Sequence, residues 1–272
     1  MDKILFPVLI SFAVAIICGV ILTISSRLFA VKENEKFVKI RDCLPGANCG
    51  ACGYSGCDGY AKALSDGKTD VTNACVPGGD AAAKEIANVL GVEAEEVVKK
   101  VAYIACNGNC DAAPRKYEYH GQMTCRSANM SYNGDKLCTF ACLGYGDCAR
   151  ICPQNAILIE NGVAKVDPTL CVGCGMCTRV CPNHVIHLVR DTSRVAVLCS
   201  NHDKGAVTRK ACSNGCIGCG KCQKICPNDA IHVDHNLAVV DHDKCIGCGK
   251  CADTCPVGCI SKEMFKCDIL SK

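Results

Sequence analysis

A long uncharged segment opens the chain. Between Ile4 and Ile24 the sequence ILFPVLISFAVAIICGVILTI runs for 21 residues without a charged side chain. As a helix with a rise of 1.5 Å per residue it reaches about 30 Å, the thickness of the hydrocarbon core of a bilayer. A cleaved signal peptide is the alternative, but its apolar core spans roughly 7–15 residues and ends in small residues. Because Arg27-Leu28-Phe29 follows here, we expect a retained transmembrane anchor over residues 1–27.

After the anchor, apolar positions recur at helical spacing over short distances only. Asp80 is placed to cap a helix over Ala81 to Leu90, and Gly91 ends it. Val92 to Lys100 follows as a second amphipathic stretch, for which we also predict a helix. These small helices are expected to pack over a nearby cysteine site.

Farther along, short apolar runs predict two hairpins. The first joins Ala156-Ile157 to Val163–Val166 through Asn161-Gly162, a dipeptide that favours tight turns. The second joins Ala230–Val233 to Leu237–Val240.

Composition shows that something other than a conventional core stabilises the fold. The 272 residues include 29 cysteines and no tryptophan, and aromatics make up 5%. Bound metal can supply folding free energy where large side chains are few. A disulfide scaffold is typical of short secreted domains, and the length and the odd cysteine count argue against it. The net charge of +3 is too small to indicate a nucleic-acid partner.

Most cysteines belong to an internal repeat. Twenty of the 29 lie in the second half of the chain, from Cys138 onward, and eight pairs are related by a constant offset of 74. The first copy holds Cys138, Cys142, Cys148, Cys152, Cys171, Cys174, Cys177 and Cys181, and the second holds Cys212, Cys216, Cys222, Cys226, Cys245, Cys248, Cys251 and Cys255.

The spacing within the copies indicates the ligand chemistry. Residues 245–256 follow C-x2-C-x2-C-x3-C-P, the bacterial ferredoxin pattern for [4Fe–4S] clusters. Zinc sites normally use paired C-x2-C halves, so the triplets argue against zinc. Residues 212–219 also resemble the cluster motif of radical enzymes that use S-adenosylmethionine, but too few residues follow for the barrel of those enzymes. The pattern predicts an electron carrier.

In a two-cluster ferredoxin, three cysteines of one motif and the last cysteine of the other bind the same cluster. This rule predicts four ligand sets. Set A is Cys138, Cys142, Cys148 and Cys181, and set B is Cys152, Cys171, Cys174 and Cys177. Set C is Cys216, Cys219, Cys222 and Cys255, and set D is Cys226, Cys245, Cys248 and Cys251.

One ligand of the second copy is ambiguous. Cys212 is the repeat equivalent of Cys138, but Cys219 gives the usual C-x2-C-x2-C spacing, and we choose Cys219 for set C. In the first copy Tyr145 stands at the equivalent of Cys219, so Cys138 is assigned to set A.

A further cysteine cluster, set N, lies between the anchor and the repeat. Cys49, Cys52, Cys57 and Cys75 follow C-x2-C-x4-C-x17-C, which is not ferredoxin-like. Interspersed glycines allow the backbone to approach an ion or a cluster closely. By spacing alone, set N fits a four-thiolate site for either zinc or an iron–sulfur cluster.

The five sets use 20 cysteines. Cys106, Cys110 and Cys125 are candidate ligands of a sixth site, with Cys43 and Cys212 as further candidates, and spare buried thiols are the alternative. Cys18, Cys199, Cys259 and Cys267 also remain. We find no G-x-G-x-x-G after a strand, no P-loop, no catalytic triad and no carboxylate dyad. The chain is therefore expected to bind no nucleotide or flavin and to hold no self-contained catalytic site.

The anchor, the Leu44-Pro-Gly-Ala-Asn-Cys49-Gly-Ala-Cys52-Gly segment, Cys75 before Val76-Pro-Gly-Gly, and the tandem ferredoxin motifs together resemble the B subunits of the Rnf complex. The resemblance covers essentially the whole chain and favours iron–sulfur over zinc for set N. Family members with one ferredoxin module are common, so the duplication is a departure that leaves the number of clusters open.

The resemblance implies an electron-transfer subunit of a membrane-bound ferredoxin:NAD⁺ oxidoreductase that pumps Na⁺ or H⁺. Such a subunit takes electrons from soluble ferredoxin and relays them through about five, or six, [4Fe–4S] clusters towards its partner subunits. An alternative is a membrane-anchored polyferredoxin that serves a hydrogenase or formate dehydrogenase, and another is a metal-stabilised assembly scaffold. Basic residues concentrated after the span, among them Lys36, Lys39 and Arg41, predict a single pass of the cell (inner) membrane with the iron–sulfur domains in the cytoplasm.

The expected fold class is α+β. We predict a transmembrane anchor at 1–27, a four-cysteine [4Fe–4S] domain at 28–105 and a cysteine-containing connector at 106–132. Two bacterial-type 2[4Fe–4S] ferredoxin modules follow at 133–191 and 212–272, joined by a second connector at 192–211.

Overall fold

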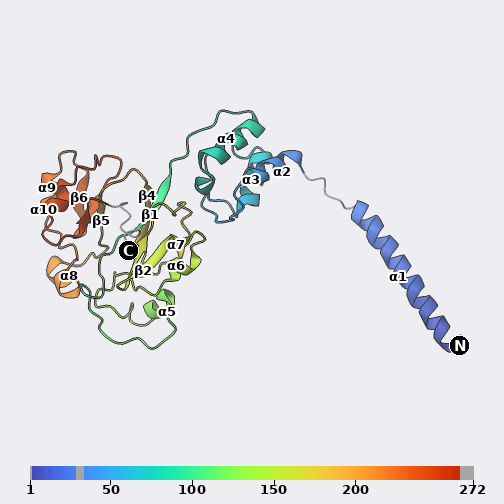
Figure 1. Ribbon diagram of the computed structural model, residues 1–272, viewed down its shortest axis with the longest axis horizontal. Coiled ribbons are helices and arrows are strands. Elements are labelled where there is room, and N and C mark those ends of the chain that lie inside the picture. The colour runs from blue at the N-terminus through green and yellow to red at the C-terminus, as the bar shows by residue number, and fades with distance from the viewer. Residues whose placement is uncertain (1, 29–33, 264–272) are drawn as a thin grey trace.

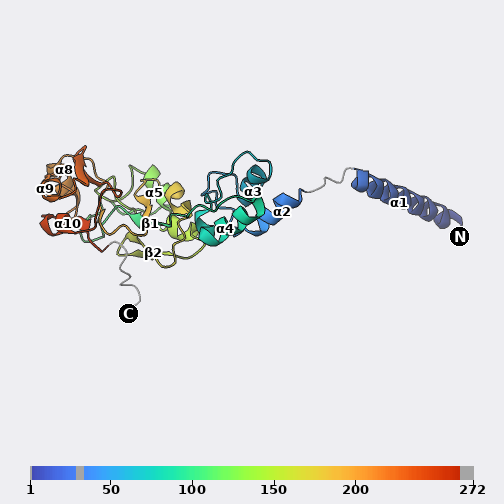
Figure 2. The same cartoon turned by 90° about the horizontal axis from the view of Figure 1, so that it is seen from above.

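A computed structural model describes residues 2–28 and 34–263 of the chain (Figure 1). Helix α1 (Asp2–Leu28) lies at one end, a small helical domain follows it, and the larger mixed helix and strand body lies at the other end. The view from above shows the same order along the long axis (Figure 2). Phe29 and Cys267 lie outside the described residues.

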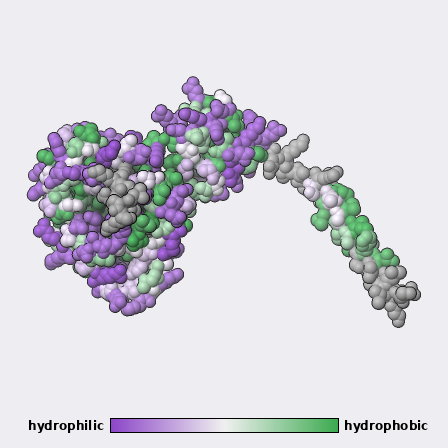
Figure 3. Space-filling view, in the orientation of Figure 1, coloured by the Kyte–Doolittle hydropathy of each residue, from purple (hydrophilic) through white to green (hydrophobic). Residues whose placement is uncertain are grey.

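Helix α1 covers the predicted anchor. Its apolar side chains Leu9, Phe12, Ile16 and Val20 are each at least half exposed, and the part of the helix that Figure 3 colours is mostly hydrophobic. Within residues 2–28 and 34–263, no helix combines the length and the apolarity that crossing a membrane requires. The transmembrane anchor is therefore not confirmed and stays a prediction.

The helical domain contains α2 (Glu35–Asp42), α3 (Cys57–Ser65), a 3-10 turn η1 (Val76–Gly78) and α4 (Gly79–Leu90). Its core is small, and Ile40, Tyr60 and Ile86 are fully buried at the centre. Burying such a side chain contributes about 1.5–3 kcal/mol. The predicted helix ending at Leu90 is confirmed, and Gly91 takes the left-handed conformation that commonly ends a helix.

The prediction of a second helix over residues 92–100 is wrong, and so is the capping role of Asp80. The N-cap of α4 is Gly78, whereas Asp80 Oδ1 accepts a hydrogen bond of 2.8 Å from the Val97 N–H. This contact and the 3.2 Å bond from Asn73 Nδ2 to the Glu96 carbonyl hold an extended segment. The segment leads into strand β1 (Lys100–Ile104), so pairing of β1 elsewhere overrides the local helical pattern.

Both predicted hairpins are present. β2 (Ile157–Glu160) pairs with β3 (Val163–Val166), and β6 (Ile231–Asp234) pairs with β7 (Leu237–Val240). In the first hairpin both turn residues, Asn161 and Gly162, have positive φ, as a tight two-residue turn requires.

Each hairpin accompanies two five-residue helices and a second two-stranded sheet. The helices are α6 (Asp147–Ile151) and α7 (Met176–Val180) in the first module and α9 (Lys221–Ile225) and α10 (Lys250–Thr254) in the second. The second sheets pair β1 with β4 (Ile186–Arg190) and β5 (Ala196–Val197) with β8 (Ile260–Ser261). α5 (Cys125–Met130) and α8 (Gly205–Ala211) precede the cysteine motifs.

The sheet registers reveal an equivalence that the cysteine repeat does not contain. Ile104 of β1 pairs with Ile186, and Val197 of β5 pairs with Ile260. Because Ile186 and Ile260 are related by the same offset as the repeated cysteines, β1 is to the first module what β5 is to the second. Strand β1, which the prediction assigned to the four-cysteine domain, thus forms a sheet with the first ferredoxin module.

Candidate iron–sulfur sites

Three of the predicted ligand sets surround hollows of similar size. All four cysteines of set B line a space of about 360 Å³, and all four of set D line another of about 360 Å³. Those of set C line one of about 310 Å³, together with Cys259. The structure therefore brings together cysteines from the two motifs of each module, as the crossed ferredoxin arrangement requires.

A short local structure recurs at each motif. Every five-residue helix follows a glycine with positive φ, holds a buried cysteine and ends at a cysteine whose backbone is extended. The proline that follows lacks an N–H group and clashes with a continuing helix. The last cysteine therefore turns out of its helix towards the other half of the module. These terminal cysteines are Cys152, Cys181, Cys226 and Cys255.

Backbone N–H groups point at the sulfurs. Ala156 N–H donates to Cys152 Sγ at 3.4 Å, and Ala230 N–H donates to Cys226 Sγ at 3.3 Å. Ala102 N–H on β1 donates to Cys171 Sγ at 3.5 Å. Hydrogen bonds to the sulfurs are among the means by which proteins tune iron–sulfur clusters, so this donor set fits the group.

Within the described part of the chain, no three Cys, His, Asp or Glu side chains stand close enough to hold one metal ion. The thiols of a [4Fe–4S] site bind four separate irons, so they surround a hollow and do not converge on one point. The hollows lined by sets B, C and D have that form.

Burial raises the pKa of several of these thiols, among them Cys75, Cys174 and Cys222. Burial, together with neighbouring sulfurs, raises the pKa of Cys148 and that of Cys177 to about 12. Since thiolates bind iron, loading of the sites releases protons. Cys216 differs, because a hydrogen bond with Cys259 lowers its pKa to about 6. The same bond raises the pKa of Cys259, which stays a thiol.

The predicted ligands of set A lie in two places. Cys142 and Cys148 belong to the core of the first module, and Cys181 packs against it. The buried sulfur of Cys125 lies close enough to Cys148 and Cys181 to raise the pKa of both, although burial is the larger cause. Cys138 instead lines a separate hollow with Cys106, Cys199 and Cys212. The assignment of Cys138 to set A stays a prediction, and the geometry favours Cys125 in its place.

Set N gathers in the helical domain. Cys57 and Cys75 are buried in its core, and Cys52 packs against the same cluster. Burial is the main cause that raises the pKa of Cys75, and Cys57, Cys52 and Cys49 add to it, so these sulfurs face one another.

The helical domain contacts the first module beside set B. Arg179 of α7 donates to the carbonyl oxygens of Cys49 at 3.1 Å and Gly50 at 2.8 Å. Cys49 also contributes to the raised pKa of Cys174, behind burial. Sets N and B are therefore neighbours.

Three remaining cysteines have structural surroundings. Cys43 Sγ donates to the Lys39 carbonyl at 3.1 Å, within its own helical turn. Cys110 is exposed, beside the β2–β3 turn, and its N–H donates to the Asn161 carbonyl. Cys259 is the repeat equivalent of the buried Val185, so it occupies a core position of the second module.

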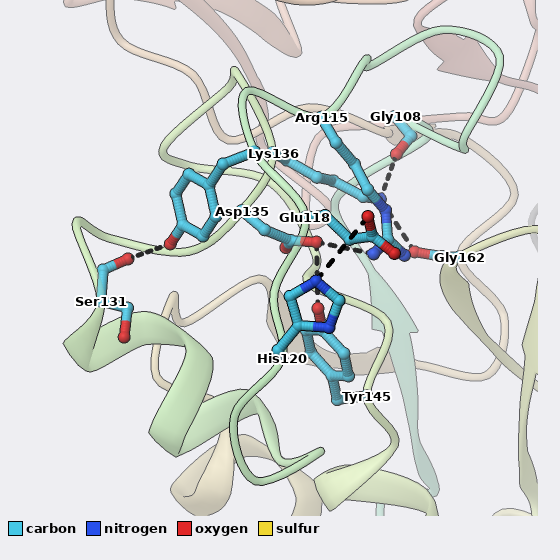
Figure 4. A network of polar contacts seen from close by, with 10 residues as sticks. Gly108, Arg115, Glu118, His120, Ser131, Asp135, Lys136, Tyr145 and Gly162 are labelled. Atoms are coloured by element: carbon cyan, nitrogen blue, oxygen red, sulfur yellow. Dashed lines mark hydrogen bonds and ion pairs between the residues drawn. The ribbon is translucent and has the colours of Figure 1, made fainter.

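A buried polar network lies beside the first module (Figure 4). Lys136 is fully buried, and its ammonium donates to the carbonyls of Gly108 at 2.7 Å and Gly162 at 2.8 Å. The neighbouring Asp135 pairs with Arg115 at 2.9 Å and accepts from the Tyr145 hydroxyl at 2.9 Å. Tyr145 thus has a structural partner at the position where the second module has Cys219.

From the sequence alone, Cys125 is only an extra candidate and Cys199 has no assignment. The sequence could not place Cys125 beside Cys148 and Cys181, because only the folded structure brings them together. Cys125 lies on α5, in an insertion that has no counterpart in the second copy. Cys199 follows β5 as Cys106 follows β1, but that equivalence depends on strand pairing.

Comparison with known proteins finds iron–sulfur domains over the regions that contain these cysteines. A 4Fe-4S dicluster domain profile matches residues 194–262, a 4Fe-4S binding domain profile matches 164–187, and a putative Fe-S cluster profile matches 44–77. The chain is 43% identical to the B subunit of the Na⁺-translocating ferredoxin:NAD⁺ oxidoreductase complex of Acetobacterium woodii, over 97% of this chain and 79% of that protein. The chain belongs to the B-subunit family of ion-translocating oxidoreductases.

Two further B subunits have similar extents of alignment. That of the proton-translocating ferredoxin:NAD⁺ oxidoreductase complex of Clostridium ljungdahlii is 40% identical over 89% of this chain and 85% of its own length. That of the ion-translocating oxidoreductase complex of Methanosarcina acetivorans is 41% identical over 83% of this chain and 86% of its own. The resemblance of the sequence to B subunits is thus confirmed over most of its length.

Proposed function

We propose that this chain is the electron-transfer subunit of a membrane-bound, ion-pumping ferredoxin:NAD⁺ oxidoreductase. Membership of the B-subunit family supports this function. Hollows lined by four cysteines, with N–H groups aimed at the sulfurs, supply sites for the one-electron carriers that it needs. The catalytic chemistry on NAD⁺ belongs to partner subunits.

The ligands that we propose are the predicted sets N, B, C and D without change. For set A we propose Cys125, Cys142, Cys148 and Cys181. Bound [4Fe–4S] clusters supply one-electron oxidation and reduction without breaking bonds. The protein's own part is to fix the thiolates, to donate hydrogen bonds to them and to exclude water. The cysteines inside the short helices are each at most 8% exposed, so water is excluded from their sulfurs.

The sets follow one another through the molecule. Set N contacts set B through Arg179 and the Cys49 backbone, and sets A and B share the core of the first module. Sets C and D share that of the second. We propose that reduced ferredoxin donates at the ferredoxin modules and that set N lies towards the membrane partners, because the helical domain is the one that leads to α1 (Figure 1).

We propose that α1 anchors the protein in the cell membrane with its iron–sulfur domains in the cytoplasm. The exposed apolar side chains of α1 have no cover within the described chain. Lys36, Lys39 and Arg41 follow it in α2, as the positive-inside rule requires of a cytoplasmic flank. The Na⁺-named and the proton-named relatives are similarly close, so identity does not select the coupling ion.

Anaerobic purification with iron and sulfide analysis tests the function. We expect a brown protein with about four irons and four sulfides per set, a visible absorbance that dithionite bleaches, and low-temperature EPR signals on reduction by ferredoxin. Colourless protein, or zinc without labile sulfide, contradicts the proposal.

A further inference from the structure

A fourth cysteine-lined hollow lies outside the five proposed sets. Cys106, Cys138, Cys199 and Cys212 line a space of about 290 Å³, close to the 310 Å³ at set C and the 360 Å³ at sets B and D. The four cysteines come from both modules and from the connectors that precede them. No ferredoxin motif unites them in the sequence.

The four cysteines form two equivalent pairs. Cys138 and Cys212 are related by the repeat offset of 74. Cys106 follows Ile104 of β1 by two residues, and Cys199 follows Val197 of β5 by two residues, where the strand registers make Ile104 and Val197 equivalent. Each module therefore contributes the same pair of thiols to one hollow.

The equivalent sulfurs of Cys106 and Cys199 accept equivalent hydrogen bonds. Gly108 N–H donates to Cys106 Sγ at 3.4 Å, and Asn201 N–H donates to Cys199 Sγ at 3.5 Å, both from two residues farther along. The side chain of Asn201 also donates to Cys138 Sγ at 3.4 Å. Sets B, C and D lie among similar donors, and the pattern is that of cluster ligands.

The surroundings suit a buried cofactor. Apolar side chains pack around the hollow, among them Ala112, Ala141 and Ala211. Gly108 stands directly over it, since a Cβ there lies 3.4 Å from Cys212 Sγ and 3.6 Å from Cys106 Sγ. A side chain at this position would occupy the space above the thiols.

The hollow also touches the sites on both sides. The N–H of Cys142, a set A ligand, donates to Cys106 Sγ at 3.3 Å. The N–H of Cys216, a set C ligand, donates to Cys199 Sγ at 3.3 Å. One residue of each neighbouring set is thus hydrogen-bonded to a thiol of this hollow.

We propose that Cys106, Cys138, Cys199 and Cys212 hold a sixth [4Fe–4S] cluster, which forms the electron bridge between the two ferredoxin modules. The bridging role rests on the proposed function, whereas the ligand assignment does not. In this step one electron passes from the module that ferredoxin has reduced to the module that is still oxidised. No bond is formed or broken, and no proton is transferred.

Iron analysis of the anaerobically purified full-length chain, separated from its partner subunits, tests the site. Wild-type protein is expected to hold about 24 irons, and a count of about 20 overturns the proposal while leaving the proposed function intact, since the other sets supply those irons. A chain without iron or sulfide overturns both. The wild-type count decides without any variant.

Variants locate the cluster. C199A and C212A are each expected to lose about four irons and one EPR signal and to keep the rest, which shows that the modules remain folded. C110A and C43A, which change cysteines outside the hollow, keep the wild-type count. Unchanged iron in C199A and C212A, or one zinc lost from each in place of iron, overturns the site.

Rapid mixing with reduced ferredoxin tests the bridge. In C199A, EPR of samples frozen after mixing should show one module reduced at the wild-type rate and the other at least tenfold more slowly. Equal, wild-type rates for both modules overturn the bridging role.

Discussion

At the scale of residues, a cysteine's role depends on what faces its sulfur. Cys138 and Cys142 are neighbours in one motif, yet the Asn201 side chain, from the connector between the modules, donates to the first sulfur and the Ala164 N–H, from the first module, donates to the second. Sequence spacing predicted the cysteines that line the hollows of sets B, C and D, because their order is local to the short helices. It could not reveal that Cys125 lies beside Cys148 and Cys181 or that Cys138 lines a hollow with Cys199, since both depend on contacts across the fold.

Moving one thiol from position 125 to position 145 tests the ligands that we propose for set A. C125A is expected to lose about four irons, because one thiolate of the set is removed. Adding Tyr145→Cys restores the C-x2-C-x2-C spacing of the second module, so C125A/Y145C should regain them. Iron analysis and EPR measure both steps.

C110A is the control, since Cys110 is exposed on the same connector. A full iron count in C125A contradicts the assignment of this residue.

The buried Lys136 is expected to tune nearby clusters. Burial raises the pKa of Cys142 to about 11, and the positive charge of Lys136 acts in the opposite direction. Removing that charge in K136M makes reduction harder, so one midpoint potential should become more negative by on the order of 60 mV, which is about 1.4 kcal/mol for one electron. EPR-monitored redox titration measures the shift.

K165M is the matched control, because Lys165 is exposed and pairs with Glu160 at the surface. Unchanged potentials in K136M with full iron content contradict a tuning role.

At the scale of elements, the sequence predicted correctly those elements whose hydrogen-bond partners are close in the chain. The hairpins were predicted correctly because a two-residue turn and alternating apolar residues specify them. The extended segment before β1 was missed, because its partners, Asp80 and β4, lie elsewhere in the chain. The same limit hid the equivalence of β1 and β5.

Two neighbouring glycines test how the cysteine loop packs against its hairpin. Gly144 and Gly146 both have positive φ, so alanine at either costs about 1–2 kcal/mol. A Cβ at Gly144 lies 2.4 Å from the Gly162 carbonyl oxygen, whereas at Gly146 the nearest atom is 3.5 Å away. G144A should therefore lower the thermal unfolding temperature and the iron content well below those of G146A.

The second module has the equivalent close approach, because a Cβ at Gly218 lies 2.8 Å from the Asn236 carbonyl oxygen. G218A should resemble G144A. Equal stability of G144A and G146A contradicts the importance of this contact.

At the scale of the molecule, the helical domain links α1 to the two modules (Figure 1). The polar and charged surface of the modules in Figure 3 contrasts with the apolar surface of α1. Composition predicted that metal stabilises a chain with few large side chains, and the small cores built around cysteines agree with this. The sixth site that we propose depends on how the two modules meet, which composition does not reveal.

Removal of residues 1–28 tests the anchor. The truncated chain is expected to leave the membrane fraction and to retain its irons, because none of the proposed ligands lies in that segment. Fractionation of cells that express both forms, followed by iron analysis, measures the outcome. A truncated chain that stays in membranes without its partner subunits contradicts the anchoring role of α1.

The equivalent pairs of thiols at the junction have an evolutionary consequence. One module and the segment before it supply one such pair, which is half of the four-thiol hollow. Two joined copies therefore have a site that neither copy can form alone. Later loss of either copy removes that site along with the clusters of the copy itself.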